Sequence, residues 1–234
     1  MDYAQWTPVY DRLLADLGYD RAGDETARDR LVPLTDRFDL GPLRERIRGA
    51  TVAIAGGADS LATEIGVARD ADVVIAASVA ADTCLDHGAP VDCMVTDLDK
   101  NPATARRLTH EGVPVAVHAH GDNLDLVESV VPDCTSEAVL PTTQAEPVAH
   151  VRNFGGFTDG DRAAFLADHL GAATLRFPGW DLDDPGVEPA KRAKLDWAAR
   201  LLRWLERRRG GRFGPLDGRR TALDEDPLTP PYDD

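Results

Sequence analysis

The stretch Val113-Pro-Val-Ala-Val-His-Ala-His-Gly-Asp-Asn123 joins an apolar run of strand length to a cluster of polar residues. A short β-branched run that ends near glycine is typical of a buried strand in a parallel sheet. Upstream, Val91-Asp-Cys-Met-Val-Thr-Asp-Leu-Asp99 has the same design and ends in two carboxylates. Ligands of open α/β sheets bind at the carboxyl ends of such strands. We therefore predict two strands that deliver acidic side chains to one edge of a sheet, as a metal-assisted site requires.

Strand-like and helix-like segments alternate through the central part of the chain. The predicted strands cover residues 51–55, 73–77, 93–96, 113–117, 138–140 and 173–177. Most of them are followed by a segment with helical periodicity. This alternation predicts an α/β fold with a doubly wound, mostly parallel sheet.

The segments on either side of this alternation are predicted to be helical. Residues 1–48 form an N-terminal helical lobe that packs against the α/β catalytic domain, residues 49–180, or closes over its site. Residues 181–214 form a C-terminal helical segment, whose helix covers residues 190–209 and ends at a glycine pair. Residues 215–234 are rich in Pro, Asp and Gly, and we expect them to be a disordered tail.

The composition restricts the partners of the chain. Its 41 acidic and 26 basic residues give a net charge of -15, and its three lysines are Lys100, Lys191 and Lys194. Because such a surface repels nucleic acid and anionic membranes, we expect neither as a partner. The sequence contains no run of membrane-spanning length and no basic, apolar leader, and its three cysteines lack metal or redox spacing. We expect a cytoplasmic protein, for which a homo-oligomer is possible.

Asp97 and Asp99 stand two residues apart just after a predicted strand. If the chain stays extended through Leu98, both carboxylates point to the same side. Such a pair suits Mg²⁺ that also contacts substrate phosphates. Asp122, after the next strand, adds a second acid to the same edge. The alternative is that Asp97 or Asp99 caps the helix that begins near Asn101.

His118 and His120 admit a zinc site, because imidazoles two apart on a strand face one side. No third nitrogen or sulfur ligand stands at motif spacing. We therefore favour hydrogen-bonding histidines, or histidines placed against a phosphate.

The loop Asn153-Phe-Gly-Gly-Phe-Thr-Asp-Gly-Asp-Arg162 is predicted to bind an anion. Its glycines let backbone approach a ligand closely, and Thr158 or Asp159 is placed to cap the following helix. Arg162 in the first helical turn opposes the helix dipole, which favours a role as a phosphate clamp. Gly56-Gly57 after the first strand is a weaker candidate, and no Walker lysine motif is present.

Five elements of the chain, in order, resemble the archaeal-type 6-hydroxymethyl-7,8-dihydropterin pyrophosphokinase family. They are Ala81-Asp82, Thr96 to Asp99, His118 to Asn123, Thr142 to Gln144 and Asn153 to Arg162. The chain departs from the family pattern at Asp59, which replaces a proline, and at Thr83 and Lys100, which replace glycines.

The resemblance implies a fold like the catalytic domain of thiamin pyrophosphokinase, and transfer of diphosphate from ATP to a reduced hydroxymethylpterin. The products, AMP and the pterin diphosphate, would serve tetrahydrofolate or tetrahydromethanopterin synthesis. The implied Mg²⁺ ligands are Asp97, Asp99 and Asp122, with Asp82 as a further candidate. Either His120 or Asp122 would accept the hydroxyl proton. The implied ATP-binding residues are Gly56, Gly57, Thr142, Gln144, Asn153, Gly155, Gly156, Thr158, Asp159, Asp161 and Arg162.

Two other functions remain open from the sequence. Asp97-Leu98-Asp99 resembles the metal-binding Asp-x-Asp of nucleotide-sugar glycosyltransferases, which would release UDP from a sugar donor. A nucleotide-binding regulator without turnover would bind ATP and form no AMP.

Overall fold

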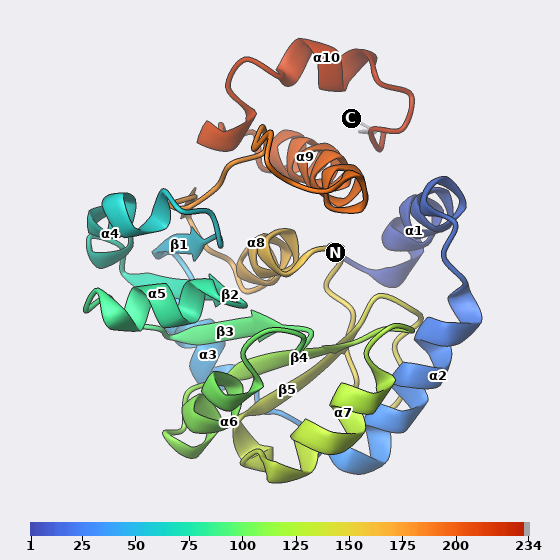
Figure 1. Cartoon of the computed structure of the whole chain (residues 1–234), viewed down its shortest axis with the longest axis vertical. Coiled ribbons are helices and arrows are strands. Elements are labelled where there is room, and N and C mark those ends of the chain that lie inside the picture. The colour runs from blue at the N-terminus through green and yellow to red at the C-terminus, as the bar shows by residue number, and fades with distance from the viewer. Residues whose placement is uncertain (232–234) are drawn as a thin grey trace.

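The computed structural model describes residues 1–231, which build a six-stranded sheet between two layers of helices (Figure 1). All strand pairs are parallel, in the order β5-β4-β3-β2-β1-β6. The strands are β1 (Thr51–Ala55), β2 (Val73–Ala77), β3 (Cys93–Thr96), β4 (Val115–Ala119), β5 (Val139–Thr143) and β6 (Thr174–Arg176). The predicted α/β fold with a doubly wound sheet is confirmed.

Side chains alternate across the sheet and separate two hydrophobic cores. In β1, Val52 and Ile54 face one core while Ala53 and Ala55 face the other. The helices of the α/β unit are α4 (Leu61–Arg69), α5 (Ala80–Asp86), α6 (Pro102–His110), α7 (Leu124–Val130) and α8 (Asp159–His169). The first core also contains α8, and the second contains α4 to α7. Short 3-10 turns follow several helices, at Val32–Leu34, Val131–Asp133 and Ser136–Ala138.

The first 48 residues are helical, as predicted, and their helices pack against both sides of the sheet. Helix α1 (Tyr3–Leu17) packs in the core that contains α8, whereas α2 (Arg21–Leu31) packs in the opposite core beside α7 (Figure 1). Gly41-Pro42 starts α3 (Gly41–Ile47), because proline is favoured in the first turn of a helix. The N-terminal helices therefore complete both layers of the α/β unit.

The C-terminal helix agrees with its prediction. Helix α9 (Pro189–Arg209) ends at Gly210, which adopts a left-handed conformation with a φ of 60°. Its apolar face packs against α8 in the first core, and its side chains Trp197, Leu201 and Leu205 are fully buried. None of the helices within residues 1–231 is long and apolar enough to cross a membrane.

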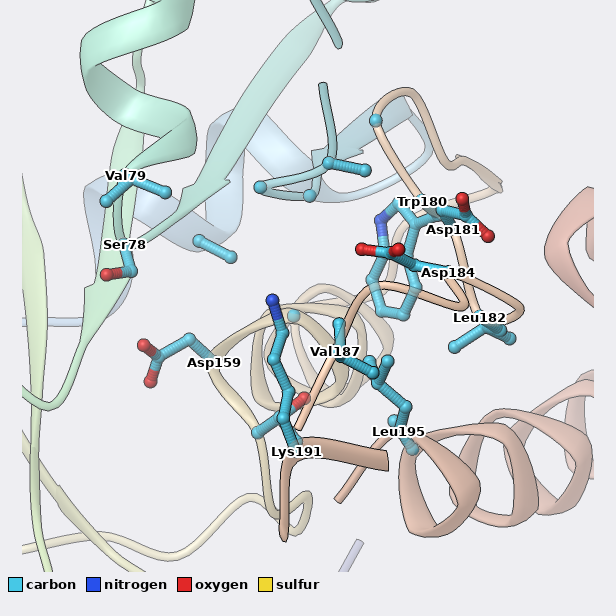
Figure 2. Close-up of a pocket in the computed structure, with 18 of the residues that line it drawn as sticks. Ser78, Val79, Asp159, Trp180, Asp181, Leu182, Asp184, Val187, Lys191 and Leu195 are labelled. Atoms are coloured by element: carbon cyan, nitrogen blue, oxygen red, sulfur yellow. The ribbon is translucent and has the colours of Figure 1, made fainter. Parts of the chain in front are cut away.

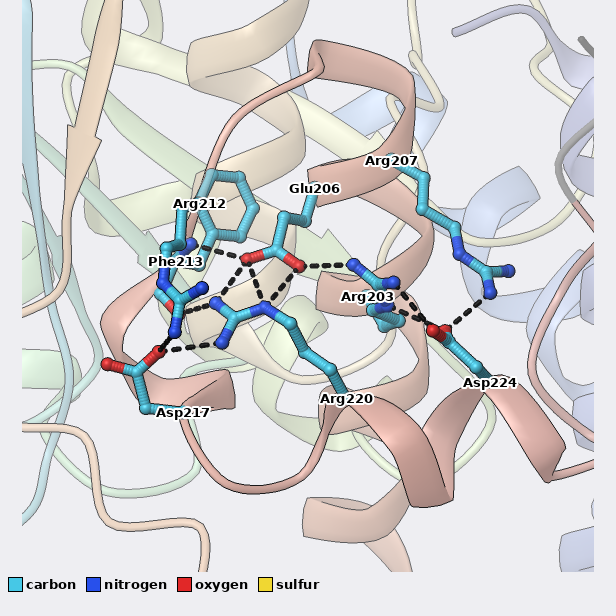
Figure 3. A network of polar contacts seen from close by, with 8 residues as sticks. All are labelled: Arg203, Glu206, Arg207, Arg212, Phe213, Asp217, Arg220 and Asp224. Carbon is cyan, nitrogen blue, oxygen red and sulfur yellow. Dashed lines mark hydrogen bonds and ion pairs between the residues drawn. The ribbon is translucent and has the colours of Figure 1, made fainter.

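The prediction of a disordered tail from residue 215 is wrong for residues 215–231, and residues 232–234 lie outside the described part. A 3-10 turn (Gly214–Leu216) and α10 (Arg220–Glu225) cover α9, with Leu216 fully buried. Glu206 of α9 is 1% exposed and accepts hydrogen bonds from Arg203, Arg220 and the Phe213 N–H (Figure 3). The composition of this segment suggested disorder because its charged side chains pair with residues of another helix, which composition does not reveal.

Candidate active site

Two adjoining cavities lie at the carboxyl ends of the strands, where the fold places ligands. The first, of about 410 Å³, is bordered by the loops after β1 and β2 and by residues 179–187 (Figure 2). The second, of about 510 Å³, is bordered by the loops after β3 and β4 and by the start of α2. Six residues line both cavities: Ser78, Lys100, Thr158, Asp159, Lys191 and Leu195.

Asp97 and Asp99 line the second cavity, as predicted, but the backbone between them is not extended. Leu98 has a φ of 71° and is fully buried, and the Asp99 N–H donates to Asp97 Oδ1 at 3.2 Å. The two carboxylates are therefore brought together by a tight turn rather than by the alternation of a strand. Neither carboxylate caps α6, which begins at Pro102 after Asn101.

The acids around this turn perturb one another. Burial and the neighbouring Asp97 raise the pKa of Asp99 to about 6. Burial would also raise the pKa of Asp97, but hydrogen bonds from His120 and Asp99 and the charge of Arg162 outweigh it and lower the pKa. Burial, with Asp97 as the next cause, raises the pKa of Asp159 to about 7. Negative charge is thus in excess at the edge of the second cavity.

This donor set fits Mg²⁺ held jointly with phosphates rather than a cation site made by protein alone. Within residues 1–231, no group of three or more His, Cys, Asp or Glu side chains is arranged to bind a metal ion. Mg²⁺ is commonly bound by one or two carboxylates together with substrate phosphates. Asp97 and Asp99 provide such a pair. Asp122 is exposed on the wall of the same cavity, whereas Asp82 lines neither cavity and accepts hydrogen bonds from Asn101 and Thr104.

His120 lies beside the acid pair, and His118 lies behind it. His120 Nε2 is 3.5 Å from Asp97 Oδ2, and its Nδ1 accepts from the Asp122 N–H at 3.3 Å. His118 falls inside β4, is 3% exposed, and contacts Thr142 Oγ1 at 3.1 Å. Burial lowers the pKa of His118 well below its ordinary value, so the ring is neutral. The two rings do not converge on one cavity, which gives no support to the zinc alternative.

The ends of β3 and β4 are tied together by Asn123, whose side chain is 3% exposed. Its amide nitrogen donates to the carbonyls of Asp97 at 2.8 Å and His118 at 2.7 Å. Its amide oxygen accepts from the His120 N–H at 2.9 Å. Asn123 thus sets the distance between the two acidic loops.

The glycine-rich loop is built differently from its prediction. Gly155 and Gly156 have φ values of 89° and 92°, and a Cβ on Gly156 would lie 2.6 Å from the backbone of Arg162. These glycines allow close packing on α8, and neither lines the two large cavities. Thr158 is the N-cap of α8, one of the two predicted caps, and the fully buried Asp161 completes a capping box by accepting from the N–H groups of Phe157 and Thr158.

Of the predicted ATP-binding residues, some face the cavities and others shape the loops behind them. Asn153 bonds to backbone carbonyls, and Thr142 bonds to Val117 and His118 within the sheet. Neither Asn153 nor Thr142 lines the two cavities. The predicted residues that do line them are Gly56, Gly57, Gln144, Thr158, Asp159 and Arg162.

Arg162 is held in the wall of the second cavity with 7% of its surface exposed. Its Nη1 pairs with Asp159 Oδ1 at 3.1 Å, and its Nη2 donates to Gln144 Oε1 at 3.0 Å. Its position agrees with the predicted phosphate clamp, and contact with phosphate stays a prediction.

Asp24 of α2 is a site residue that the sequence did not reveal. This carboxylate is 4% exposed and accepts hydrogen bonds from Gly121 N–H at 2.8 Å, Gln144 Nε2 at 2.6 Å and Tyr10 OH at 2.5 Å. Asp24 therefore links the His120–Asp122 loop to the side chain of Gln144, which in turn accepts a hydrogen bond from Arg162. Its partners lie up to 120 positions away in the chain, and no local motif marks it.

The first cavity also contains a residue that the sequence analysis missed. The ring of Trp180 lies at the wall of the first cavity (Figure 2), and its indole N–H donates to the Ile54 carbonyl at 2.9 Å. A Cβ on Gly56 or Gly160 would lie within 2.8 Å of its ring. Gly56 is therefore required for the packing of this ring, in addition to any contact with a ligand.

Comparison with known proteins agrees with this geometry. Residues 31–186 match the family described as 6-hydroxymethylpterin diphosphokinase MptE-like. The chain belongs to this family. A relative from Methanothermobacter thermautotrophicus, named 6-hydroxymethyl-7,8-dihydropterin pyrophosphokinase, is 34% identical over 88% of this chain and 96% of its own length. A relative of the same name from Pyrococcus furiosus is 36% identical over 88% of this chain and 95% of its own length.

The match to the MptE-like family ends short of two parts of the site. Asp24 lies before residue 31, and the α9 residues that line the cavities lie after residue 186. In this MptE-like protein, both flanking helical segments therefore contribute to the cavity walls.

Proposed function

We propose that the protein transfers a diphosphate group from ATP to 6-hydroxymethyl-7,8-dihydropterin, with Mg²⁺ as cofactor, and releases AMP. The observation that carries the proposal is the pair Asp97 and Asp99, which lines the second cavity together with Arg162 and next to Lys100, a residue that lines both cavities. The names of the curated relatives supply the pterin. The product would be a precursor of tetrahydrofolate or tetrahydromethanopterin.

The two cavities suit the two substrates. Gly56, Gly57 and Trp180 border the first, where a nucleoside would bind. The second combines the aromatic rings of Tyr19 and Phe157, whose centroids are 6.1 Å apart, with polar groups on α2. A flat pterin with several hydrogen-bonding groups would bind there, with its hydroxymethyl group toward the acid pair.

In the reaction, the pterin hydroxymethyl oxygen attacks the β-phosphorus of ATP, the bond from that phosphorus to the oxygen of the α-phosphate breaks, and AMP leaves. The protein mainly positions the groups and compensates their charge. Mg²⁺, when bound by Asp97 and Asp99, would neutralise the phosphates. Arg162, fixed by Asp159 and Gln144, is placed to contact the transferred diphosphate.

The hydroxyl proton would pass to His120 or Asp122. Both ring nitrogens of His120 already have partners, Asp97 and the Asp122 N–H. The Asp122 carboxylate is exposed on the cavity wall and makes no hydrogen bond within residues 1–231 that would occupy it. These contacts favour Asp122 as the proton acceptor.

The test is incubation with ATP, Mg²⁺ and reduced hydroxymethylpterin, with products separated by chromatography. AMP and pterin diphosphate are expected from the wild type and from Asp70→Asn, which removes an exposed carboxylate outside both cavities. The Asp99→Asn variant should form neither product. ADP as the sole nucleotide product would refute the proposal, and release of UDP from a sugar donor would favour a glycosyltransferase.

A further inference from the structure

The place where the two cavities meet is the place where a polyphosphate chain must pass. The reaction joins a nucleotide to a pterin through phosphate, so with one substrate in each cavity the phosphates lie between them. Three of the shared residues, Ser78, Lys100 and Lys191, are not among the residues that the family resemblance implies. Lys191 extends from α9 into the first cavity (Figure 2).

The lysines of this chain are concentrated at this junction. The sequence contains three, and all of them line a cavity: Lys100 and Lys191 line both, and Lys194 lines the second. The other 23 basic residues are arginines, and they are spread over the molecule. The lysines therefore differ from the other basic residues in being placed at the cavities. An anion-binding role explains why the point-like ammonium groups are gathered here.

The lysine charges are not paired with acidic side chains of the described residues, although Lys194 Nζ lies over the Tyr19 ring, 5.9 Å from its centroid. No ion pair within residues 1–231 includes a lysine, whereas an arginine is the basic partner in every pair except that of His120 with Asp97. Lys191 stands in the first turn of α9, where a positive charge opposes the helix dipole. Its placement is therefore unfavourable for the helix and needs another reason.

Ser78 supplies an independent indication of a ligand at the junction. It follows β2 with a φ of 48°, a conformation that favours glycine, and it is 8% exposed. Ser78 lines both cavities, and its hydroxyl oxygen is buried and has no hydrogen-bond partner within the described residues. A buried hydroxyl without a partner is uncommon, and a phosphate oxygen would satisfy it.

We propose that Lys100, Lys191 and Lys194, together with the Ser78 hydroxyl, bind the polyphosphate of the nucleotide between the two cavities. This proposal rests on the proposed function for the identity of the substrate. It makes the start of α9, which lies outside the match to the family, a part of the active site. It also assigns a role to Lys100, which replaces a glycine of the family pattern, as a cation added beside the acid pair.

The test measures the binding of inorganic tripolyphosphate by calorimetry, in the presence of Mg²⁺. Lys191→Gln and Lys194→Gln should each raise the dissociation constant about tenfold, the effect of losing one charged hydrogen bond. Lys191→Arg should recover part of the affinity, since it restores the charge. The matched control is Arg37→Gln, which removes an exposed positive charge outside both cavities and should leave the constant unchanged.

Ser78→Gly separates binding from stability. It relieves the left-handed backbone, so the melting temperature should stay equal or rise while tripolyphosphate binding weakens. Wild-type affinity in both lysine-to-glutamine variants would overturn the proposal, even if AMP is formed. Lysine-dependent tripolyphosphate binding without AMP formation would support the phosphate site and refute the proposed reaction.

Discussion

Replacement of Asp24 by asparagine tests whether the N-terminal helices organise the site. Asp24 Oδ1 accepts one hydrogen bond, from Gly121, and Oδ2 accepts two, from Tyr10 and Gln144. An asparagine keeps one acceptor oxygen and adds a donor. Its best orientation directs the oxygen to Tyr10 and Gln144, and leaves its NH₂ group facing the Gly121 N–H. Two donor groups, the Gly121 N–H and the buried asparagine NH₂, then have no acceptor.

The cost follows from these contacts. A buried donor without a partner costs about 1–3 kcal/mol, and the two remaining hydrogen bonds weaken because their acceptor is no longer charged. We expect a loss of about 3 kcal/mol in the free energy of unfolding, which is roughly 6–12 °C in melting temperature for a chain of this size. Because Gly121 and Gln144 position the His120–Asp122 loop and Arg162, kcat should fall roughly tenfold or more.

The assays are thermal unfolding, followed by circular dichroism, and AMP formation at a temperature well below the melting transition. Tyr10→Phe is the matched control, because it removes one hydrogen bond from Asp24 and leaves Gly121 and Gln144 attached. It should lower the melting temperature and keep kcat near the wild-type value. An Asp24→Asn variant with unchanged kcat would show that this carboxylate stabilises the fold without positioning the site.

Three further predictions concern the acid pair, the C-terminal network and salt. Asp97→Asn should abolish turnover with little change in melting temperature, and near wild-type activity at saturating Mg²⁺ would remove this residue from the metal site. Glu206→Gln should cost about 3 kcal/mol, because it leaves the charges of Arg203 and Arg220 without their buried partner. The pKa of Glu206 lies below its ordinary 4.5: burial opposes this, and the hydrogen bonds from Arg220, Phe213 and Arg203 outweigh it. Its contribution is therefore complete above pH 4.5 and is lost as the pH falls through the lowered pKa, so the variant's melting temperature should depend less on pH in that acidic range. With a net charge of -15, the melting temperature should rise between dilute buffer and molar KCl, as the Debye length falls from roughly 30 Å to roughly 3 Å. A flat or falling melting temperature would mean that the loss of arginine–carboxylate pairs outweighs the relief of repulsion.

Much of the fold could be predicted from the sequence, because local patterns encode it. Apolar runs of strand length alternate with helical periodicity, and this alternation is nearly sufficient for a parallel sheet. The boundaries of the elements differ from the prediction: β4 begins at Val115 and extends to Ala119, two residues beyond the predicted end. That shift places His118 inside the sheet, paired in register with Thr142, and leaves His120 at the cavity.

The sequence by itself determined the strand–helix alternation, the acid pair at Asp97 and Asp99, and the C-terminal helix. Each of these depends on residues close together in the chain. The tertiary structure decided which of the marked residues face a ligand. Asp82 bonds to the side chains of Asn101 and Thr104, and Asp161 and the glycine pair before Phe157 support backbone, whereas the unmarked Asp24 lines the site. The tertiary structure also explains why residues 215–231 are folded: their charged side chains form ion pairs with side chains of α9. The physical reason is the same in each case: a buried polar group is satisfied by whatever the fold brings next to it, and that neighbour is set by packing rather than by spacing in the sequence.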